Sequence, residues 1–200
     1  VNVRIRVDSI EYINHFPSTS LFSLAAGIPS QLAITSGQPA SVSAGVTQSA
    51  NLVLQLQDAW NNPTSQSDTV SVTIAAVESL NDTVVKKTIG NYTISPLANS
   101  LTVNKDLLTL TLVGDYKFRI VPTGLPTTLT RDFSIRNAAA QKLVITQNMP
   151  STVSSGITFS PVLRVQVQDL YDNPVLDSVT TVSATLISGT VQSLTGATAS

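Results

Sequence analysis

The residues that most often perform catalysis are nearly absent from this chain. It has 200 residues, no Cys and a single histidine, His15. Without Cys there is no thiolate nucleophile, thiolate metal site or disulfide, and a Ser/His/Asp arrangement would have to use His15. This histidine lies in a predicted extended loop at 12–17, and no second imidazole is available to share a zinc ion. We therefore interpret it as a loop residue and predict a protein that is not an enzyme and binds no cofactor.

Two pairs of oxygen-bearing side chains have a spacing that suits a cation or a turn. They are Asp58 with Asn62, and Asp169 with Asn173. Calcium takes about six to eight oxygen ligands, usually with several carboxylates. The carboxylates available to complete such a site are Asp115, Asp132 and Asp177. We favour the alternative, in which each Asp accepts backbone N–H groups of a turn before Asn-Pro, and we predict no metal site. Both pairs are candidate turn or inter-domain residues.

Two aromatic residues stand beside these pairs at equivalent positions, Trp60 and Tyr171. They are candidate stacking aromatics for a carbohydrate. The alternative, which we favour, is that each aromatic ring covers the end of a domain or contacts the next one.

Two sequons, Asn81-Asp82-Thr83 and Asn91-Tyr92-Thr93, fit the N-glycosylation acceptor and stand next to predicted turns. Asn81 and Asn91 are therefore candidate glycosylation sites. Ser and Thr number 25 each, while charged residues make up only 12% of the chain. This composition suits either a sugar-coated surface or a β-rich one whose hydroxyls face water.

The charge balance argues against several partner classes. The chain has 11 basic and 12 acidic residues and a net charge of −1, so no basic field is present to bind nucleic acid. No apolar stretch approaches the roughly 20 residues that span a bilayer. The chain begins with Val1 and shows no signal segment, which leads us to expect a mature or internal piece of a protein.

The elements that would position these residues repeat along the chain. The segment 31–63 aligns without a gap with 142–174, an offset of 111, and about 15 of these 33 positions are identical. The same offset places Phe133-Ser134-Ile135 on Phe22-Ser23-Leu24. We therefore predict three parts: the C-terminal strands of a preceding repeat at 1–27, a complete domain at 28–140, and the N-terminal part of a following repeat at 141–200.

Each repeat has the period-two pattern of strands with one face on a core. Leu52, Leu54 and Leu56 alternate with polar or outward residues, and their counterparts in 163–168 keep this pattern. Further strands are expected at 70–74, 83–89, 108–112, 116–120 and 129–135, with turns including Gly90-Asn91. About seven short strands per domain favour an all-β fold of tandem immunoglobulin-like Greek-key β-sandwiches.

The run Val165-Gln166-Val167-Gln168-Asp169-Leu170-Tyr171-Asp172-Asn173-Pro174-Val175 resembles a known repeat pattern, V-x-V-x-D-x-x-G-N-x-V. This pattern is typical of the tandem immunoglobulin-like repeats of large surface proteins, adhesins and filament proteins. Asn61 and Asp172 stand where the pattern usually has Gly, and both residue types tolerate left-handed turn geometry. The resemblance implies an extracellular or cell-surface stalk or fibre, and it implies no activity.

The leading functional hypothesis is a structural building block of an extracellular filament, surface stalk or adhesin shaft. Its partners would be other copies of itself or neighbouring domains of the same long chain. In one version the strands at 1–7 and 21–25 of one copy complete the open sandwich at 141–200 of another, although the counterpart of 89–115 would still be missing. The alternatives are a carbohydrate- or protein-binding adhesive module with its site on loops 61–68 and 172–178, and an accessory domain of a secreted hydrolase.

Overall fold

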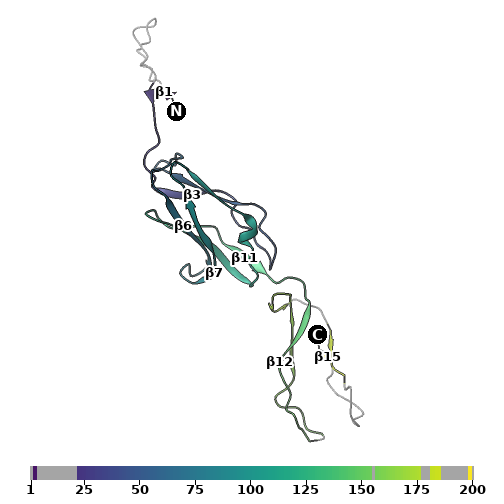
Figure 1. The fold of residues 1–200 in the computed structure, drawn as a ribbon. Coiled ribbons are helices and arrows are strands. Elements are labelled where there is room, and N and C mark those ends of the chain that lie inside the picture. The colour runs from purple at the N-terminus through teal and green to yellow at the C-terminus, as the bar shows by residue number, and fades with distance from the viewer. Residues whose placement is uncertain (1, 4–21, 155, 177–180, 186–197, 200) are drawn as a thin grey trace, which may run out of the picture. The chain divides into compact units, whose positions relative to one another are not determined.

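The computed structural model describes residues 2–3, 22–154, 156–176, 181–185 and 198–199 (Figure 1). His15 and Asp177 lie outside the described residues, as do most positions of the predicted strand at 1–7. The described residues form strands, turns and irregular segments with one short 3-10 turn, so the predicted all-β class is confirmed. Within them, no helix has the length and apolar character needed to cross a membrane.

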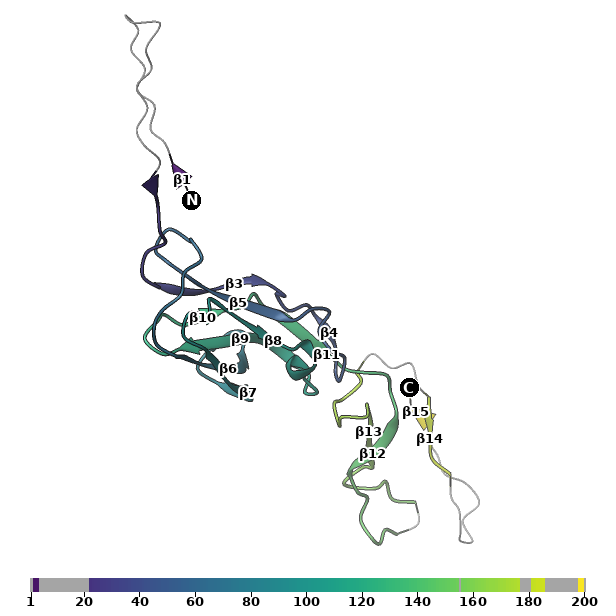
Figure 2. The ribbon, with the colours of Figure 1, turned by 45° about the horizontal axis from the view of Figure 1, so that its top comes forward.

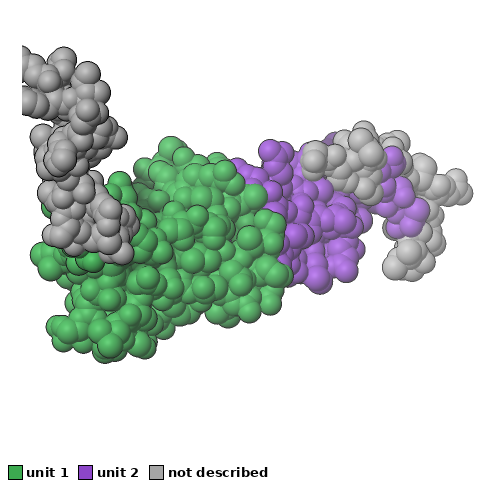
Figure 3. All heavy atoms as spheres, turned by 90° about the horizontal axis from the view of Figure 1, so that it is seen from above, with its two compact units in different colours: residues 1–40, 48–108, 115–133 green, residues 41–47, 109–114, 134–200 purple. Residues whose placement is uncertain are grey.

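The chain contains two compact units (Figure 3). Unit 1 comprises 1–40, 48–108 and 115–133, and unit 2 comprises 41–47, 109–114 and 134–200. These units differ from the sequence-predicted parts, because 41–47 and 109–114 group with the C-terminal segment. The predicted boundaries after 27 and 140 therefore stay a prediction.

Unit 1 is built around two antiparallel sheets (Figure 2). The first has the strand order β3-β5-β8, with β3 at Gln31–Ser36, β5 at Leu52–Gln57 and β8 at Ser100–Val103. The second has the order β9-β6-β7, with β6 at Val70–Glu78, β7 at Val85–Ile94 and β9 at Gly114–Pro122. Strand β10 (Thr128–Leu129) pairs with β9, and the chain then continues into β11 (Phe133–Arg136). A short pair joins β1 (Asn2–Val3) to β2 (Phe22–Ser23) of the same chain.

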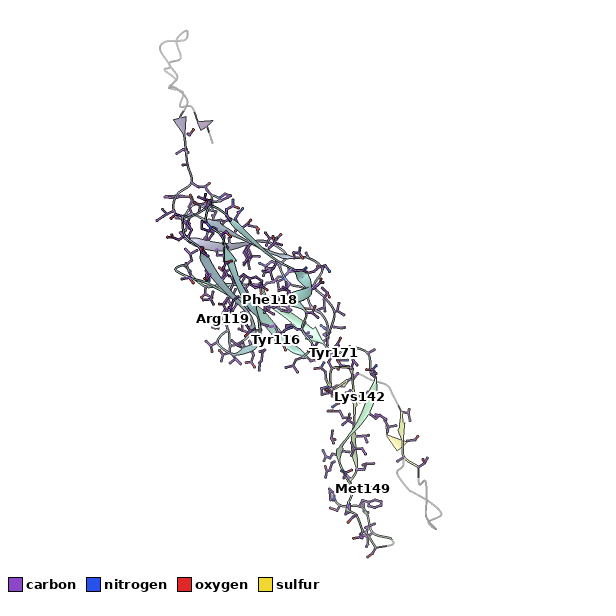
Figure 4. The ribbon with its side chains drawn as sticks, in the orientation of Figure 1. Tyr116, Phe118, Arg119, Lys142, Met149 and Tyr171 are labelled. Atoms are coloured by element: carbon purple, nitrogen blue, oxygen red, sulfur yellow. The ribbon has the colours of Figure 1, made fainter. Side chains whose placement is uncertain are left out.

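The core of unit 1 comes from the alternation seen in the sequence. The inward residues of β5, Leu52, Leu54 and Leu56, have no exposed surface. Opposite them, β6 and β9 contribute their own buried sets. The centroids of the Phe118 and Phe133 rings lie 5.0 Å apart. Figure 4 labels Phe118, which belongs to β9. Two sheets that bury their alternating apolar faces are compatible with a β-sandwich.

Two local predictions were wrong. The segment 108–112 is not a strand, because a 3-10 turn at Lys105–Leu108 is followed by irregular backbone. Leu108 and Leu110 are nevertheless buried, which explains why they alternate with polar residues. Gly90-Asn91 is not a turn either: both residues lie within β7, where the register opposite β6 shifts between Ile74 and Ala75. Such a β-bulge accounts for a glycine inside a strand.

The described residues of unit 2 form three strand pairs. Strand β4 (Val42–Ser43) pairs in parallel with β11, and β12 (Lys142–Gln147) pairs antiparallel with β13 (Arg164–Gln168). The third pair joins β14 (Val182–Ser183) to β15 (Thr198–Ala199).

Candidate functional site

The predicted turn at the end of β5 is organised by one carboxylate. Asp58 is only 1% exposed although it follows directly after the strand. Its Oδ1 accepts the backbone N–H groups of Trp60 and Asn62, both at 2.9 Å, and its Oδ2 accepts the N–H of Gly27 at 2.9 Å. The side-chain amide of Asn62 donates to the same carboxylate at 3.1 and 3.3 Å. Asp58 thus closes the turn and ties it to the segment that precedes β3.

The turn after β13 has the same set of hydrogen bonds. Asp169 has no exposed surface and accepts the N–H groups of Tyr171 at 2.8 Å and Asn173 at 2.9 Å. The N–H of Ala138 donates to Oδ2 at 2.9 Å, across 31 residues, which is also the separation between Gly27 and Asp58. A Cβ added to Gly27 would meet its nearest neighbour at 3.4 Å, an ordinary contact, which agrees with alanine at the equivalent position 138.

The backbone around the two turns matches as well. In β3–β5 the register runs from Gln31 opposite Gln57, and in β12–β13 it runs from Lys142 opposite Gln168, with the irregularity at equivalent positions in both pairs. The residues that replace the glycine of the repeat pattern both have positive φ, 66° at Asn61 and 69° at Asp172. The left-handed geometry expected at these two positions is therefore present.

A side-chain pair across each turn differs in chemistry while keeping its place. Gln31 donates from Nε2 to the side-chain oxygen of Asn61 at 2.6 Å. At the equivalent positions Lys142 forms an ion pair with Asp172. An amide pair in one copy is thus replaced by a charged pair in the other, so both members of the contact change together.

Hydrogen bonding controls the ionisation of both carboxyl groups. The N–H of Gly27 makes the largest contribution that lowers the pKa of Asp58 to about 2, although burial of the group acts against it. For Asp169, burial is the largest single effect and would raise the pKa, but the hydrogen bonds from Asn173, Ala138 and Tyr171 together lower it. Each oxygen already accepts N–H donors, so the two pairs have the hydrogen bonds of a closed turn.

The surroundings of the two turns differ, and sequence analysis did not find this difference. Within unit 2, Asn173 also donates from Nδ2 to the carbonyl oxygen of Thr111 at 2.8 Å and accepts the N–H of Val113 at 3.1 Å. Asn173 is therefore only 2% exposed, whereas Asn62 is an exposed residue. No periodicity or spacing signal indicates these bonds, because their partners lie about 60 residues upstream.

The two aromatic residues differ in exposure in the same direction as the two asparagines. Tyr171 packs against Gly45, so that a Cβ at Gly45 would lie 1.9 Å from the tyrosine hydroxyl. Tyr171 is 36% exposed, while Trp60 is 76% exposed. Trp60 borders an open hollow, which is lined by Leu24, Ala25, Ala26, Gly27, Asp58, Trp60, Asn62 and Pro63.

The two sequons lie apart from these turns. Asn81 is exposed in the turn between β6 and β7, where its side-chain oxygen accepts the hydroxyl of Thr83 at 2.7 Å. Asn91 is exposed on β7 and accepts the hydroxyl of Thr73 at 2.8 Å. Asn91 therefore lies on a strand rather than beside a turn.

One of the carboxylates that might have joined a cation site, Asp132, has other partners. Asp132 accepts the hydroxyl of Ser79 and forms an ion pair with Lys117. In the described part of the chain, no group of three or more His, Cys, Asp or Glu side chains is placed to hold a metal ion.

Comparison with known proteins adds no assignment: no family model matches the chain, and no curated protein matches it.

Proposed function

We propose that this chain is a non-enzymatic structural segment of tandem immunoglobulin-like β-sandwich repeats, acting as the shaft of an extracellular filament, surface stalk or adhesin. The observation that carries the proposal is the recurrence, 111 positions apart, of one strand register and one carboxylate-centred turn. Repeated domains with the same link at each junction form a regular rod, and a rod requires no reactive site.

The second strand pair supports this proposal, because the residues of its inner face are exposed, whereas their counterparts in unit 1 are buried. Leu143 is 53% exposed, whereas its counterpart Leu32 in β3 is 1% exposed. In the same way Val165 is 39% exposed and its counterpart Leu54 is fully buried. Exposed apolar strands are a liability unless another sheet covers them. In our proposal a further part of the repeat, or strands from another copy in a head-to-tail assembly, covers the β12–β13 face.

Electron microscopy of material isolated from its natural source tests this function. Long filaments or thin stalks with a regular axial repeat are the expected result, and the recombinant 200-residue chain imaged alone is the control. Discrete compact particles in the native material would contradict a shaft function.

The proposal includes glycosylation at Asn81 and Asn91, because both side chains are exposed in sequon context. Intact-mass analysis of the native protein before and after glycosidase treatment tests it, with Asn81→Gln and Asn91→Gln as separate variants. An unmodified mass at both positions would remove this part of the proposal.

A second candidate function, a carbohydrate-binding module, is favoured by the exposed Trp60 beside its hollow. Aromatic faces of this kind stack on sugar rings. A glycan array compares the chain with its Trp60→Ala variant, and a signal that both proteins share, or none above background, would count against this function.

A further inference from the structure

The exposed face around Trp60 has a docked counterpart in the same molecule. The face consists of Leu24, Gly27, Trp60 and Asn62, and its counterparts 111 positions later are Ile135, Ala138, Tyr171 and Asn173. In unit 2 the counterparts contact 41–47 and 109–114, through the bonds of Asn173 and the packing of Tyr171 on Gly45. Among the described residues, the structure therefore shows this surface buried in one copy and exposed in the other.

The exposed fractions at equivalent positions show how far the two copies of this surface differ. Ile135 is 2% exposed and pairs with Val42 of β4, while Leu24 is 59% exposed. Trp60 is 76% exposed against 36% for Tyr171, and only the asparagine of unit 2 is buried. A large apolar side chain and an amide that are buried in one copy are thus exposed in the other. Single exposed apolar residues are common, but a group of them with a buried counterpart is not.

We infer that this face docks on the end of an adjoining domain of the same kind. The occupant is a surface equivalent to 41–47 and 109–114, and it belongs to the repeat whose last strand is β2. The inference rests on the tandem repeat in the proposed function and adds to it the residues that join one domain to the next. In the docked state the amide of Asn62 donates to a backbone carbonyl and accepts a backbone N–H, as Asn173 does with Thr111 and Val113.

The occupied junction also defines what its partner surface must provide. At position 45 a glycine with φ of 76° leaves room for the aromatic ring, and a Cβ there would lie 1.9 Å from the Tyr171 hydroxyl. The partner of Trp60 therefore needs a glycine at the equivalent position, because a larger ring than tyrosine must fit there. Gly156, which has φ of 80° and no atom within 4 Å of an added Cβ, is the matched position without a docked ring.

The experiment places a copy of the repeated domain before the chain. Residues 1–23 are replaced by a copy of 28–134, so that the last strand of the copy continues into Leu24. The copy carries Trp60→Tyr, which leaves the original Trp60, the single tryptophan of the sequence, as the only fluorophore of its type. Acrylamide quenching of Trp60 is then compared with that of the 200-residue chain. We expect quenching to fall several-fold and the emission to shift to shorter wavelength.

Two variants and one control separate docking from folding. Gly45→Ala in the added copy and Asn62→Ala in the original chain are each expected to return Trp60 to its exposed signal. Gly156→Ala, the control, is expected to leave the signal unchanged. Circular dichroism and a cooperative unfolding transition establish that the added domain is folded. A folded added domain with Trp60 as quenchable as before would overturn the docking inference while leaving the shaft function standing.

A second measurement does not depend on the fused protein. Hydroxyl-radical footprinting compares Trp60 in native material with Trp60 in the recombinant 200-residue chain, using Tyr171 as the internal reference. Several-fold protection of Trp60 alone is the expected result. Equal modification in both samples would overturn the inference, even if microscopy shows filaments.

Discussion

Replacing Asn173 and Asn62 separately by alanine compares one side chain in two settings. Both amides donate to the Asp of their own turn, at 2.9 and 3.2 Å for Asn173 and at 3.1 and 3.3 Å for Asn62. These losses are similar and largely cancel in the comparison. Asn173 makes two further bonds, to the Thr111 carbonyl and from the Val113 N–H. The difference between the two variants therefore reports the docked contact.

The size of this difference follows from the two extra bonds. A hydrogen bond contributes about 0.5–1.5 kcal/mol to stability, so Asn173→Ala should cost about 1–3 kcal/mol more than Asn62→Ala. This corresponds to about a 5- to 150-fold change in a local opening equilibrium. Because Asn173 is 2% exposed, water cannot simply replace the lost partner groups.

Amide hydrogen exchange is the appropriate assay, since it reports each turn separately. The N–H of Val113 should lose its protection in Asn173→Ala and keep it in Asn62→Ala. The backbone N–H groups of Asp58 and Asp169 donate to the backbone carbonyl oxygens of Asn62 and Asn173, at 3.0 Å in both turns. Their exchange rates measure the local loss of stability in each variant. An equal or larger effect of Asn62→Ala, or an unchanged Val113 amide, would refute the reasoning.

Three further comparisons test the packing and the electrostatics. Gly45→Ala should destabilise the protein more than Gly156→Ala, which costs only the backbone strain of about 1–2 kcal/mol; equal losses in urea unfolding would mean that no ring packs on position 45. The Phe118 side chain has no exposed surface, so Phe118→Ala should lower the free energy of unfolding by about 3–5 kcal/mol. The Leu80 side chain is fully exposed, so Leu80→Ala should change it by no more than about 0.5 kcal/mol in the same assay. The folded pKa of Asp58 is lowered to about 2, so the stability it contributes is present above about pH 4 and is lost as the pH falls through about 2. In Asp58→Asn the urea midpoint of unfolding should depend less on pH across that window. A pH dependence equal to that of the unsubstituted chain would contradict the assigned hydrogen bonds.

The alternation of apolar residues was a reliable guide to burial and a weaker guide to strands. It correctly predicted β5, where Leu52, Leu54 and Leu56 are buried. The same pattern at Leu108 and Leu110 also marks buried residues, but the backbone there forms a 3-10 turn and an irregular segment. Period-two spacing reports which side chains face the core, whereas a strand also needs a neighbouring backbone to pair with. Strand β8 was missed for the converse reason, since Ser100–Val103 is too short to show a period.

The turns were predictable because most of the groups that form them are local, and only the N–H groups of Gly27 and Ala138 come from 31 residues upstream. The Asp carboxylate, the positive φ two residues before proline and the following asparagine are determined by short spacings in the sequence. The contacts of Asn173 with Thr111 and Val113 were not predictable, because they depend on backbone groups brought together only by folding. Sequence identity between the two turns therefore predicted equal structure and gave no sign of unequal burial.

The unequal burial of Asn62 and Asn173 distinguishes a turn that only closes on itself from one that also contacts another surface. If the carboxylate network alone were the purpose of the motif, Asn62 and Asn173 would have the same surroundings, because the network is complete in both copies. The second asparagine instead uses its remaining donor and acceptor on 109–114, and the neighbouring aromatic residue covers Gly45. A rigid turn holds an amide and a ring at fixed positions, which reduces the entropy lost when they meet another surface. The carboxylate network thus prepares the turn for a contact, and that contact is formed at Asn173 and open at Asn62.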